Sequence, residues 1–250
     1  MPDRRSAQTQ LARKLLAECV GTALLVTVVV GSGIAAQRLS PDDVGLQLLQ
    51  NSTATVLGLG VLILLFGPAS GAHFNPVVSA TDWWFGRKSG TGLSGTEVLW
   101  YAVAQVIGAI LGAILANAMY EETALQIAQH HRATGATLLA EAVATAGLIA
   151  LIFTLARTGR ASLSAASVGA YIGSAYWFTS STSFANPAVT IGRIFSDTFA
   201  GIAPASVPAF ILAQIVGAGL GAVLVLALYP DVAAASDDVV VPHEATPVRT

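Results

Sequence analysis

Apolar residues along this chain gather into long stretches, rather than into the alternating or one-sided patterns of soluble domains. Six stretches have about twenty residues or more with almost no charge, enough for an α-helix to cross the hydrocarbon core of a bilayer. They cover Leu15–Ala36, Leu46–Phe66, Leu99–Met119, Ala136–Ala156, Ala161–Ser180 and Ile202–Leu228. The pattern predicts an all-α membrane protein with six transmembrane helices.

Two further apolar segments, Asn75–Phe85 and Asn186–Phe195, are too short to cross a bilayer. Each begins with an Asn-Pro pair. Asparagine is a favoured N-cap, and proline is tolerated in the first helical turn because its missing N–H is not needed there. We therefore expect two re-entrant half-helices that begin at these pairs.

The second half of the chain repeats the landmarks of the first half in the same order. The paired landmarks are Glu18 and Glu141 in Leu-Leu-Ala-Glu, Asn75-Pro76-Val77 and Asn186-Pro187-Ala188, and Gln105 and Gln214 in Ala-Gln-x-x-Gly. Each half has three spans, an odd number, so the second half enters the membrane upside down. We expect an inverted three-plus-three repeat over residues 11–229, with half-repeats at about 11–120 and 134–229. A short N-terminal arm, 1–10, precedes it, and a polar, disordered tail, 230–250, follows it.

An inverted repeat brings the N-termini of the two half-helices together from opposite sides of the membrane. Each helix N-terminus carries about half a positive charge, which repels cations and orients the oxygen of a neutral solute. The side-chain amides of Asn75 and Asn186 add donors directed into the lumen. The repeat therefore predicts a pathway along the interface between the halves.

Charge fixes an orientation and excludes several classes of function. The net charge of −2 offers no basic surface for nucleic acid. No nucleophile–base pair and no metal motif appears in the spans, so no enzyme, cofactor or metal is expected. Basic residues cluster at one set of span ends: Arg4, Arg5, Arg13, Lys14, Arg87, Lys88, Arg157 and Arg160. The positive-inside rule then places both termini in the cytoplasm.

The paired Asn-Pro loops, Ala-Glu spans and Ala-Gln-x-x-Gly spans resemble the aquaporin and aquaglyceroporin (major intrinsic protein) family over essentially residues 11–229. The resemblance implies an aquaporin-like fold and passive conduction of water and small neutral solutes. It also implies a homotetramer with one pore per subunit, surrounded by membrane lipid.

Family members commonly carry arginine directly after the second Asn-Pro-Ala, where it narrows the selectivity filter, but this chain has Val189. Counting along the family pattern gives the other filter positions as Thr55, Ser174 and Ser183, with Gly173 and Phe184 as alternates. We expect a filter wider than that of a water pore, without the donor fork of an arginine.

With valine at this position, the chain resembles the bacterial branch of aquaglyceroporins associated with arsenic resistance. That resemblance implies a bacterial inner (plasma) membrane protein and metalloid hydroxides such as arsenous acid as solutes, with glycerol and water as co-permeants. A water-selective or glycerol channel without a metalloid role is an alternative, and an ion-coupled secondary transporter is another.

Four single residues have open interpretations. Glu18 and Glu141 lie inside spans, and we favour anchors for the re-entrant loops over proton carriers. His73 is expected to line the pore or pack its loop, because no other metal-ligating residue type stands near it. Arg193 follows Val189 by about one helical turn, so it either reaches the pore mouth or pairs with Asp197.

Overall fold

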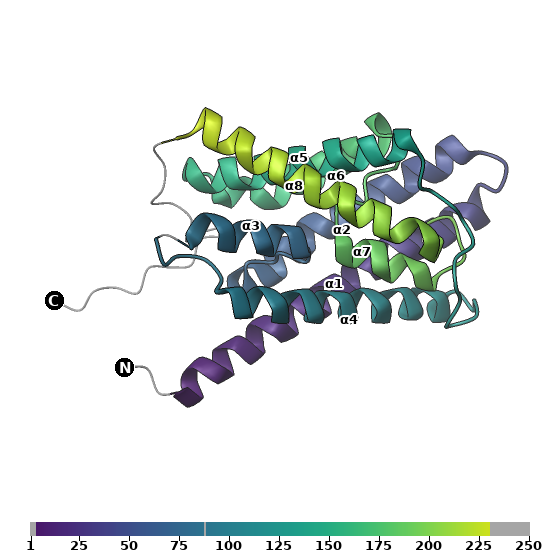
Figure 1. The fold of residues 1–250 in the computed structure, drawn as a ribbon. Coiled ribbons are helices and arrows are strands. Elements are labelled where there is room, and N and C mark those ends of the chain that lie inside the picture. Colours follow the sequence, from purple (N-terminus) through teal and green to yellow (C-terminus); the bar gives the residue numbers. More distant parts are fainter. Residues whose placement is uncertain (1–3, 88, 231–250) are drawn as a thin grey trace.

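The computed structural model describes residues 4–87 and 89–230, and all the regular secondary structure in this part of the chain is helical (Figure 1). The α-helices are α1 (Arg4–Leu39), α2 (Val44–Ser70), α3 (Pro76–Gly86), α4 (Gly95–Met119), α5 (Gly135–Arg157), α6 (Ser164–Phe178), α7 (Pro187–Gly192) and α8 (Val207–Leu228). Three short 3-10 helices join them: η1 (Ala161–Leu163), η2 (Arg193–Phe195) and η3 (Pro204–Ser206).

Among the described residues, α1, α2, α4, α5 and α8 are long and apolar enough to cross a membrane. The remaining expected span, 161–180, is instead the turn η1 followed by α6, which has 15 residues. At 1.5 Å per residue α6 is about 22 Å long, shorter than the hydrocarbon core. The six expected spans are therefore five long helices and one shorter one.

The N-terminal end of the described chain differs from the expected arm. Helix α1 begins at Arg4, so residues 4–10 are continuous with the first span rather than a separate arm. The expected tail from 231 to 250 and the expected cytoplasmic charge of Lys88 lie outside the described residues.

Glycines allow the long helices to touch backbone to backbone in the same way in both halves. A Cβ added to Gly108 of α4 would lie 2.1 Å from the carbonyl oxygen of Cys19 in α1. A Cβ added to Gly217 of α8 would lie 2.3 Å from the carbonyl oxygen of Ala142 in α5. Only glycine permits such approaches, and small-residue contacts of this kind are typical of membrane helices. The α1–α4 pair is thus repeated as the α5–α8 pair.

The two half-helices begin where the sequence predicts. Helix α3 starts at Pro76 after the N-cap Asn75, whose side chain accepts the N–H of Val77 at 3.2 Å. Helix α7 starts at Pro187, and the Asn186 side chain accepts the N–H groups of the two residues that follow Pro187. Figure 1 shows both half-helices enclosed among the longer helices.

Candidate functional site

Glu18 holds the loop that leads into α3. One carboxylate oxygen accepts the hydroxyl of Ser70 at 2.6 Å and the backbone N–H of His73 at 3.0 Å. The other accepts the backbone N–H of Phe74 and the side-chain amide of Gln105, both at 2.7 Å. The side chain is fully buried. Four donors therefore converge on one carboxylate from α2, α4 and the loop.

Glu141 repeats this arrangement contact for contact in the second half. Its oxygens accept the hydroxyl of Ser181 at 2.6 Å, the N–H groups of Phe184 and Ala185 at 2.8 Å, and the Gln214 amide at 2.7 Å. Hydrogen bonds to a carboxylate are stronger than neutral ones, and backbone donors left unpaired at this depth would be costly. Both glutamates therefore have the contacts of loop anchors.

Anchoring is needed because the loops have a strained backbone. Ala72 and Phe74 have φ values of 48° and 49°, and Ser183 and Ala185 have values of 53° and 47°. A non-glycine residue in this region is uncommon and persists only where its surroundings hold it. The strain turns the loop carbonyl groups inward, where they meet the opposite half.

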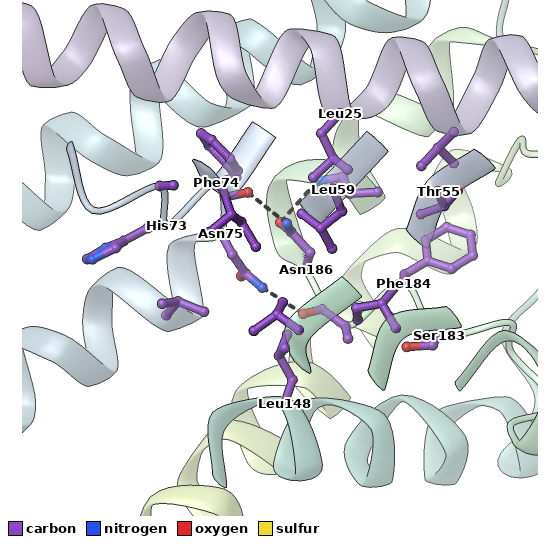
Figure 2. Close-up of a pocket in the computed structure, with 18 of the residues that line it drawn as sticks. Leu25, Thr55, Leu59, His73, Phe74, Asn75, Leu148, Ser183, Phe184 and Asn186 are labelled. Carbon is purple, nitrogen blue, oxygen red and sulfur yellow. Dashed lines mark hydrogen bonds between the residues drawn. The ribbon is translucent and has the colours of Figure 1, made fainter. Parts of the chain in front are cut away.

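The two Asn-Pro tips bind each other at the centre of the molecule (Figure 2). The Asn75 amide nitrogen donates to the carbonyl oxygen of Ala185 at 2.8 Å, and the Asn186 amide nitrogen donates to that of Phe74 at 2.7 Å. Each amide has two N–H donors, so one donor of each remains beside the cavity. The two N-caps are thereby fixed against each other.

A cavity of about 70 Å³ passes these tips, with room for a few water-sized molecules. Most of its wall is apolar: Leu25, Val29, Leu59, Ile63, Val78, Leu148, Ile152, Val168, Ile172 and Val189. Polar groups are fewer: Thr55, His73, Asn75, Asn186, Tyr176, Ser183 and Arg193. The cavity therefore combines an apolar wall with a small number of hydrogen-bonding groups, as small-molecule sites commonly do.

Several of the predicted filter residues line this cavity. Thr55, Ser183, Phe184 and Val189 all line it. The hydroxyl of Thr55 lies 3.2 Å from that of Tyr176 on α6, a residue that the counting did not select. The helical spacing of Val168, Ile172 and Tyr176, one face of α6, was the signal that could have found it.

Ser174 and its alternate Gly173 do not line the cavity, so this part of the prediction is wrong. Ser174 is exposed, and its hydroxyl donates to the carbonyl of Tyr171 at 2.8 Å. Gly173 faces α2, where a Cβ would lie 2.0 Å from Val56. Each residue turns a helix by about 100°, so a count that misses by two residues selects another face.

Arg193 reaches the cavity wall, and the expected pairing with Asp197 is wrong. Its Nε–H donates to the carbonyl oxygen of Ala200, and its guanidinium carbon lies 3.4 Å from the centre of the Phe184 ring. Asp197 instead accepts the backbone N–H of Gln129 at 2.8 Å. Because α7 ends at Gly192, Arg193 and Asp197 do not share one helix, and the four-residue rule does not apply.

His73 lies at the other side of the tips and lines the cavity. Its ring Nδ1 is 3.0 Å from the hydroxyl of Ser79, and the hydroxyl of Ser79 is within hydrogen-bond distance of Gln105. Across residues 4–87 and 89–230 no group of three side chains is arranged to hold a metal ion. The position of His73 agrees with a pore-lining or loop-packing residue.

A second cavity of about 450 Å³, here called the α7 mouth, lies beside Arg193. It is lined by Gln37, Val44, Leu48, His130, Arg132, Thr182, Arg193, Asp197, Thr198 and Phe199. Burial, with the positive charges of Arg132 and Arg193, lowers the pKa of His130 from its ordinary value. No sequence motif points to Arg132, because only the fold brings the loop 120–134 to this place.

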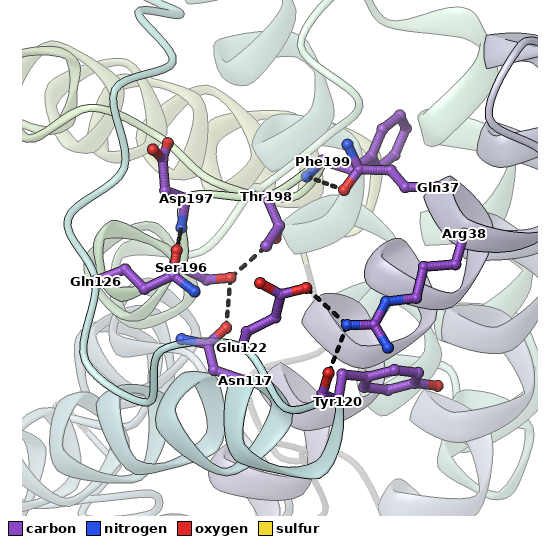
Figure 3. A network of polar contacts seen from close by, with 10 residues as sticks. All are labelled: Gln37, Arg38, Asn117, Tyr120, Glu122, Gln126, Ser196, Asp197, Thr198 and Phe199. Carbon is purple, nitrogen blue, oxygen red and sulfur yellow. Dashed lines mark hydrogen bonds and ion pairs between the residues drawn. The ribbon is translucent and has the colours of Figure 1, made fainter.

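Polar contacts tie this loop and the segment after η2 to α1 and α4 (Figure 3). The hydroxyl of Ser196 donates to the Asn117 side chain at 2.8 Å, and the N–H of Phe199 donates to the Gln37 side chain at 2.9 Å. Arg38 forms an ion pair with Glu122 at 2.8 Å. Hydrogen bonds and an ion pair therefore connect the loop 120–134 and the segment after η2, which line the α7 mouth, to α1 and α4.

The model of the family described as Major intrinsic protein matches residues 5–185. This chain belongs to the major intrinsic protein family. The protein is 46% identical over 218 residues to Aquaglyceroporin AqpS of Rhizobium meliloti (strain 1021), an alignment that covers 87% of this chain and 89% of the relative. It is 32% identical to the Glycerol uptake facilitator protein of Pseudomonas aeruginosa, with coverage of 83% and 85%.

A solved structure shows that the fold is shared. The X-ray structure of the aquaglyceroporin from Plasmodium falciparum superposes with a TM-score of 0.62 at 20% identity, covering 90% of this chain and 97% of that one. The predicted aquaporin-like fold is confirmed. The protein is an integral membrane channel of the major intrinsic protein family and not an enzyme.

Proposed function

We propose that the pore of each subunit passively conducts small uncharged hydroxylated solutes, metalloid hydroxides such as arsenous acid together with glycerol and water. The observation that carries this proposal is Val189 in the cavity wall, directly after the Asn-Pro-Ala of the second half. Valine is shorter than arginine and carries no charge, so it leaves more width for a solute larger than water.

The chemistry of the wall supports a hydroxylated solute. Asn75 and Asn186 provide amide donors, and the buried hydroxyl of Ser183 has no partner among the described residues. The aliphatic side chains around them suit the apolar side of glycerol. Arsenous acid is uncharged at neutral pH and carries three hydroxyl groups, so the same donors and acceptors serve it.

The anchors favour a channel over an ion-coupled transporter. A transporter of that kind needs an intramembrane acid that takes up an ion or proton at the substrate site. Glu18 and Glu141 are each held by four donors and do not line the cavity. The positive ends of α3 and α7 further oppose the entry of cations.

A glycerol channel without a metalloid role is the second candidate. The similarity to a protein named Glycerol uptake facilitator protein favours it. Only flux of the metalloid itself separates the two candidates, because both predict a wide neutral pore.

The proposal includes a homotetramer in a bacterial plasma membrane with both termini in the cytoplasm. Large apolar side chains are exposed along the outer faces of the spans, among them Leu57, Val61 and Leu64 of α2 and Leu212 and Val223 of α8. Exposed apolar surface of this extent suits lipid and neighbouring subunits. Chemical cross-linking in native membranes tests the subunit number, and accessibility of single-cysteine variants at the termini tests the orientation.

The experiment that tests the function is stopped-flow light scattering on proteoliposomes with water, glycerol and arsenous acid, against protein-free liposomes. The proposal predicts that all three fluxes follow the solute gradient and are unchanged by a proton or sodium ionophore. Loss of flux with the ionophore would show ion coupling. Glycerol flux without arsenous acid flux would favour the second candidate.

A further inference from the structure

Arg193 is a buried cation where the central cavity meets the α7 mouth. Its side chain lines both cavities, and only 3% of its surface is exposed. It belongs to η2, the 3-10 turn directly after α7. The fold therefore brings an arginine to the cavity wall, although Val189 occupies the position directly after Ala188.

Two contacts hold the Arg193 guanidinium group in place. Nε–H donates to the carbonyl oxygen of Ala200, and the group stacks on Phe184. A guanidinium group has five N–H donors. In the described part of the chain, no carboxylate and no second hydrogen-bond acceptor meets Arg193. Its remaining donors lie in the wall of the path that a solute takes.

Arg132 adds a second positive charge at the same mouth. It donates to the carbonyl oxygens of Gly201 at 2.7 Å and Phe199 at 2.8 Å, and its guanidinium carbon lies 5.5 Å from the centre of the Phe184 ring. Asp197 is the single carboxylate in the lining of this mouth. The mouth therefore carries two guanidinium groups against one carboxylate.

The groups near Arg193 at this end of the cavity suit a neutral solute. The Ser183 hydroxyl is buried and without a partner among the described residues, whereas Val189 and Phe184 present apolar surface. A hydroxylated solute can accept hydrogen bonds from Arg193 and exchange one with Ser183. A cation meets the positive charge of Arg193, which forms no ion pair among the described residues, in a region of low dielectric constant.

We propose that Arg193 is the specificity-determining residue of this pore. It donates hydrogen bonds to the hydroxyl oxygens of a passing neutral solute, and its charge repels cations. Arg193 thus supplies, from the next turn, the positive charge and the hydrogen-bond donors that Val189 lacks. The inference rests on the proposed neutral-solute function but concerns two separate properties, ion exclusion and preference among solutes.

The test compares Arg193→Gln with Arg157→Gln in proteoliposomes. Arg157 is a matched control because it also donates to a backbone carbonyl, that of Tyr229, and stacks on a phenylalanine, Phe85, but lines neither cavity. Arg193→Gln is expected to raise sodium conductance, measured relative to water flux, at least about tenfold. Arg157→Gln is expected to stay as cation-tight as the native protein. A cation-tight Arg193→Gln pore that still conducts water would overturn the proposed charge role.

Arg193→Lys separates the charge from the hydrogen-bonding fork. Lysine keeps the charge but has a single flexible ammonium group. The variant is expected to exclude sodium while its glycerol-to-water permeability ratio falls several-fold. An unchanged glycerol-to-water permeability ratio in Arg193→Lys would overturn the donor role. This result can be interpreted even if Arg193→Gln does not fold. Absence of glycerol flux through the native protein would contradict the proposed function and not the charge role of Arg193. The charge role would still be tested, because sodium conductance is compared with water flux.

Discussion

The two halves of the molecule share one scaffold and differ in what they place beside the solute. Glu18 and Glu141 hold their loops through matching sets of four hydrogen bonds. Seven residues after each tip asparagine, however, the first half has Asp82 and the second half has Arg193. The repeat therefore builds the fold twice, and selectivity comes from the positions where the repeat is broken.

The broken positions serve different purposes. Asp82 is buried and accepts the N–H of Leu93 at 2.7 Å, so it stabilises the turn after α3. Arg193 lines the cavity instead. Two residues before each tip asparagine, His73 and Phe184 likewise differ, and Phe184 is the residue on which Arg193 stacks. The half that carries α7 thus holds the arginine expected to discriminate among solutes.

The largest expected effect comes from removing an anchor. Glu18→Ala and Glu141→Ala each leave four buried donors without their acceptor, so each is expected to destabilise the fold by more than about 3 kcal/mol and to abolish flux. Thermal unfolding in detergent measures this. Glu97→Ala, which removes only the capping box of α4, is the control and is expected to lose about 1 kcal/mol. A severe effect at only one of the two anchors would contradict the equivalence of the halves.

The equivalence of the halves also shows which features a sequence can predict. The starts of α3 and α7 depend on Asn-Pro pairs, a local signal, and both helices begin at the expected prolines. The anchors could be inferred because Glu18 and Glu141 recur at matching places. These features repeat, so each half checks the interpretation of the other.

The features that break the repeat could not be predicted in this way. The face of α6 depends on how Gly173 packs against Val56, so counting selected Ser174 where the fold presents Tyr176. The partner of Arg193 depends on the end of α7 and on the return of the chain at Ala200. The pore-facing side of α6 and the partner of Arg193 are both set by tertiary packing. The other half of the chain does not repeat this packing, so it offers no check.

Close helix contacts are expected to show an intermediate effect. Gly217→Ala places a Cβ against the backbone of α5, and Gly108→Ala places one against α1, so each should lose about 1–3 kcal/mol of stability. Gly219 lies on the same helix as Gly217 and has no atom within 4 Å of an added Cβ. Gly219→Ala should therefore be neutral or slightly stabilising in the same thermal unfolding assay. Equal effects at Gly217 and Gly219 would contradict the packing described.

The smallest expected effect is a pH dependence at the α7 mouth. Burial and the charges of Arg132 and Arg193 lower the pKa of His130, against an opposing contribution from Asp197 and a further lowering by His131. The unfolded chain takes up this proton at an ordinary pKa of about 6.5, so the folded state loses some stability as pH falls through that value.

His130→Gln is expected to make the melting temperature less dependent on pH between about 7.5 and 5, by a small amount because the ring is largely exposed. An identical pH dependence in the native protein and in His130→Gln would show that the surroundings of His130 do not disfavour its charge.

The central claim, that Val189 makes this a wide pore for neutral solutes, is tested most directly by Val189→Arg. Stopped-flow permeabilities for water, glycerol and arsenous acid are compared between the native protein, this variant and Val189→Leu, which adds bulk without charge. The account predicts that arginine lowers glycerol and arsenous acid flux at least about tenfold while water still passes, and that leucine has a smaller effect. Unchanged glycerol and arsenous acid flux through Val189→Arg would contradict it.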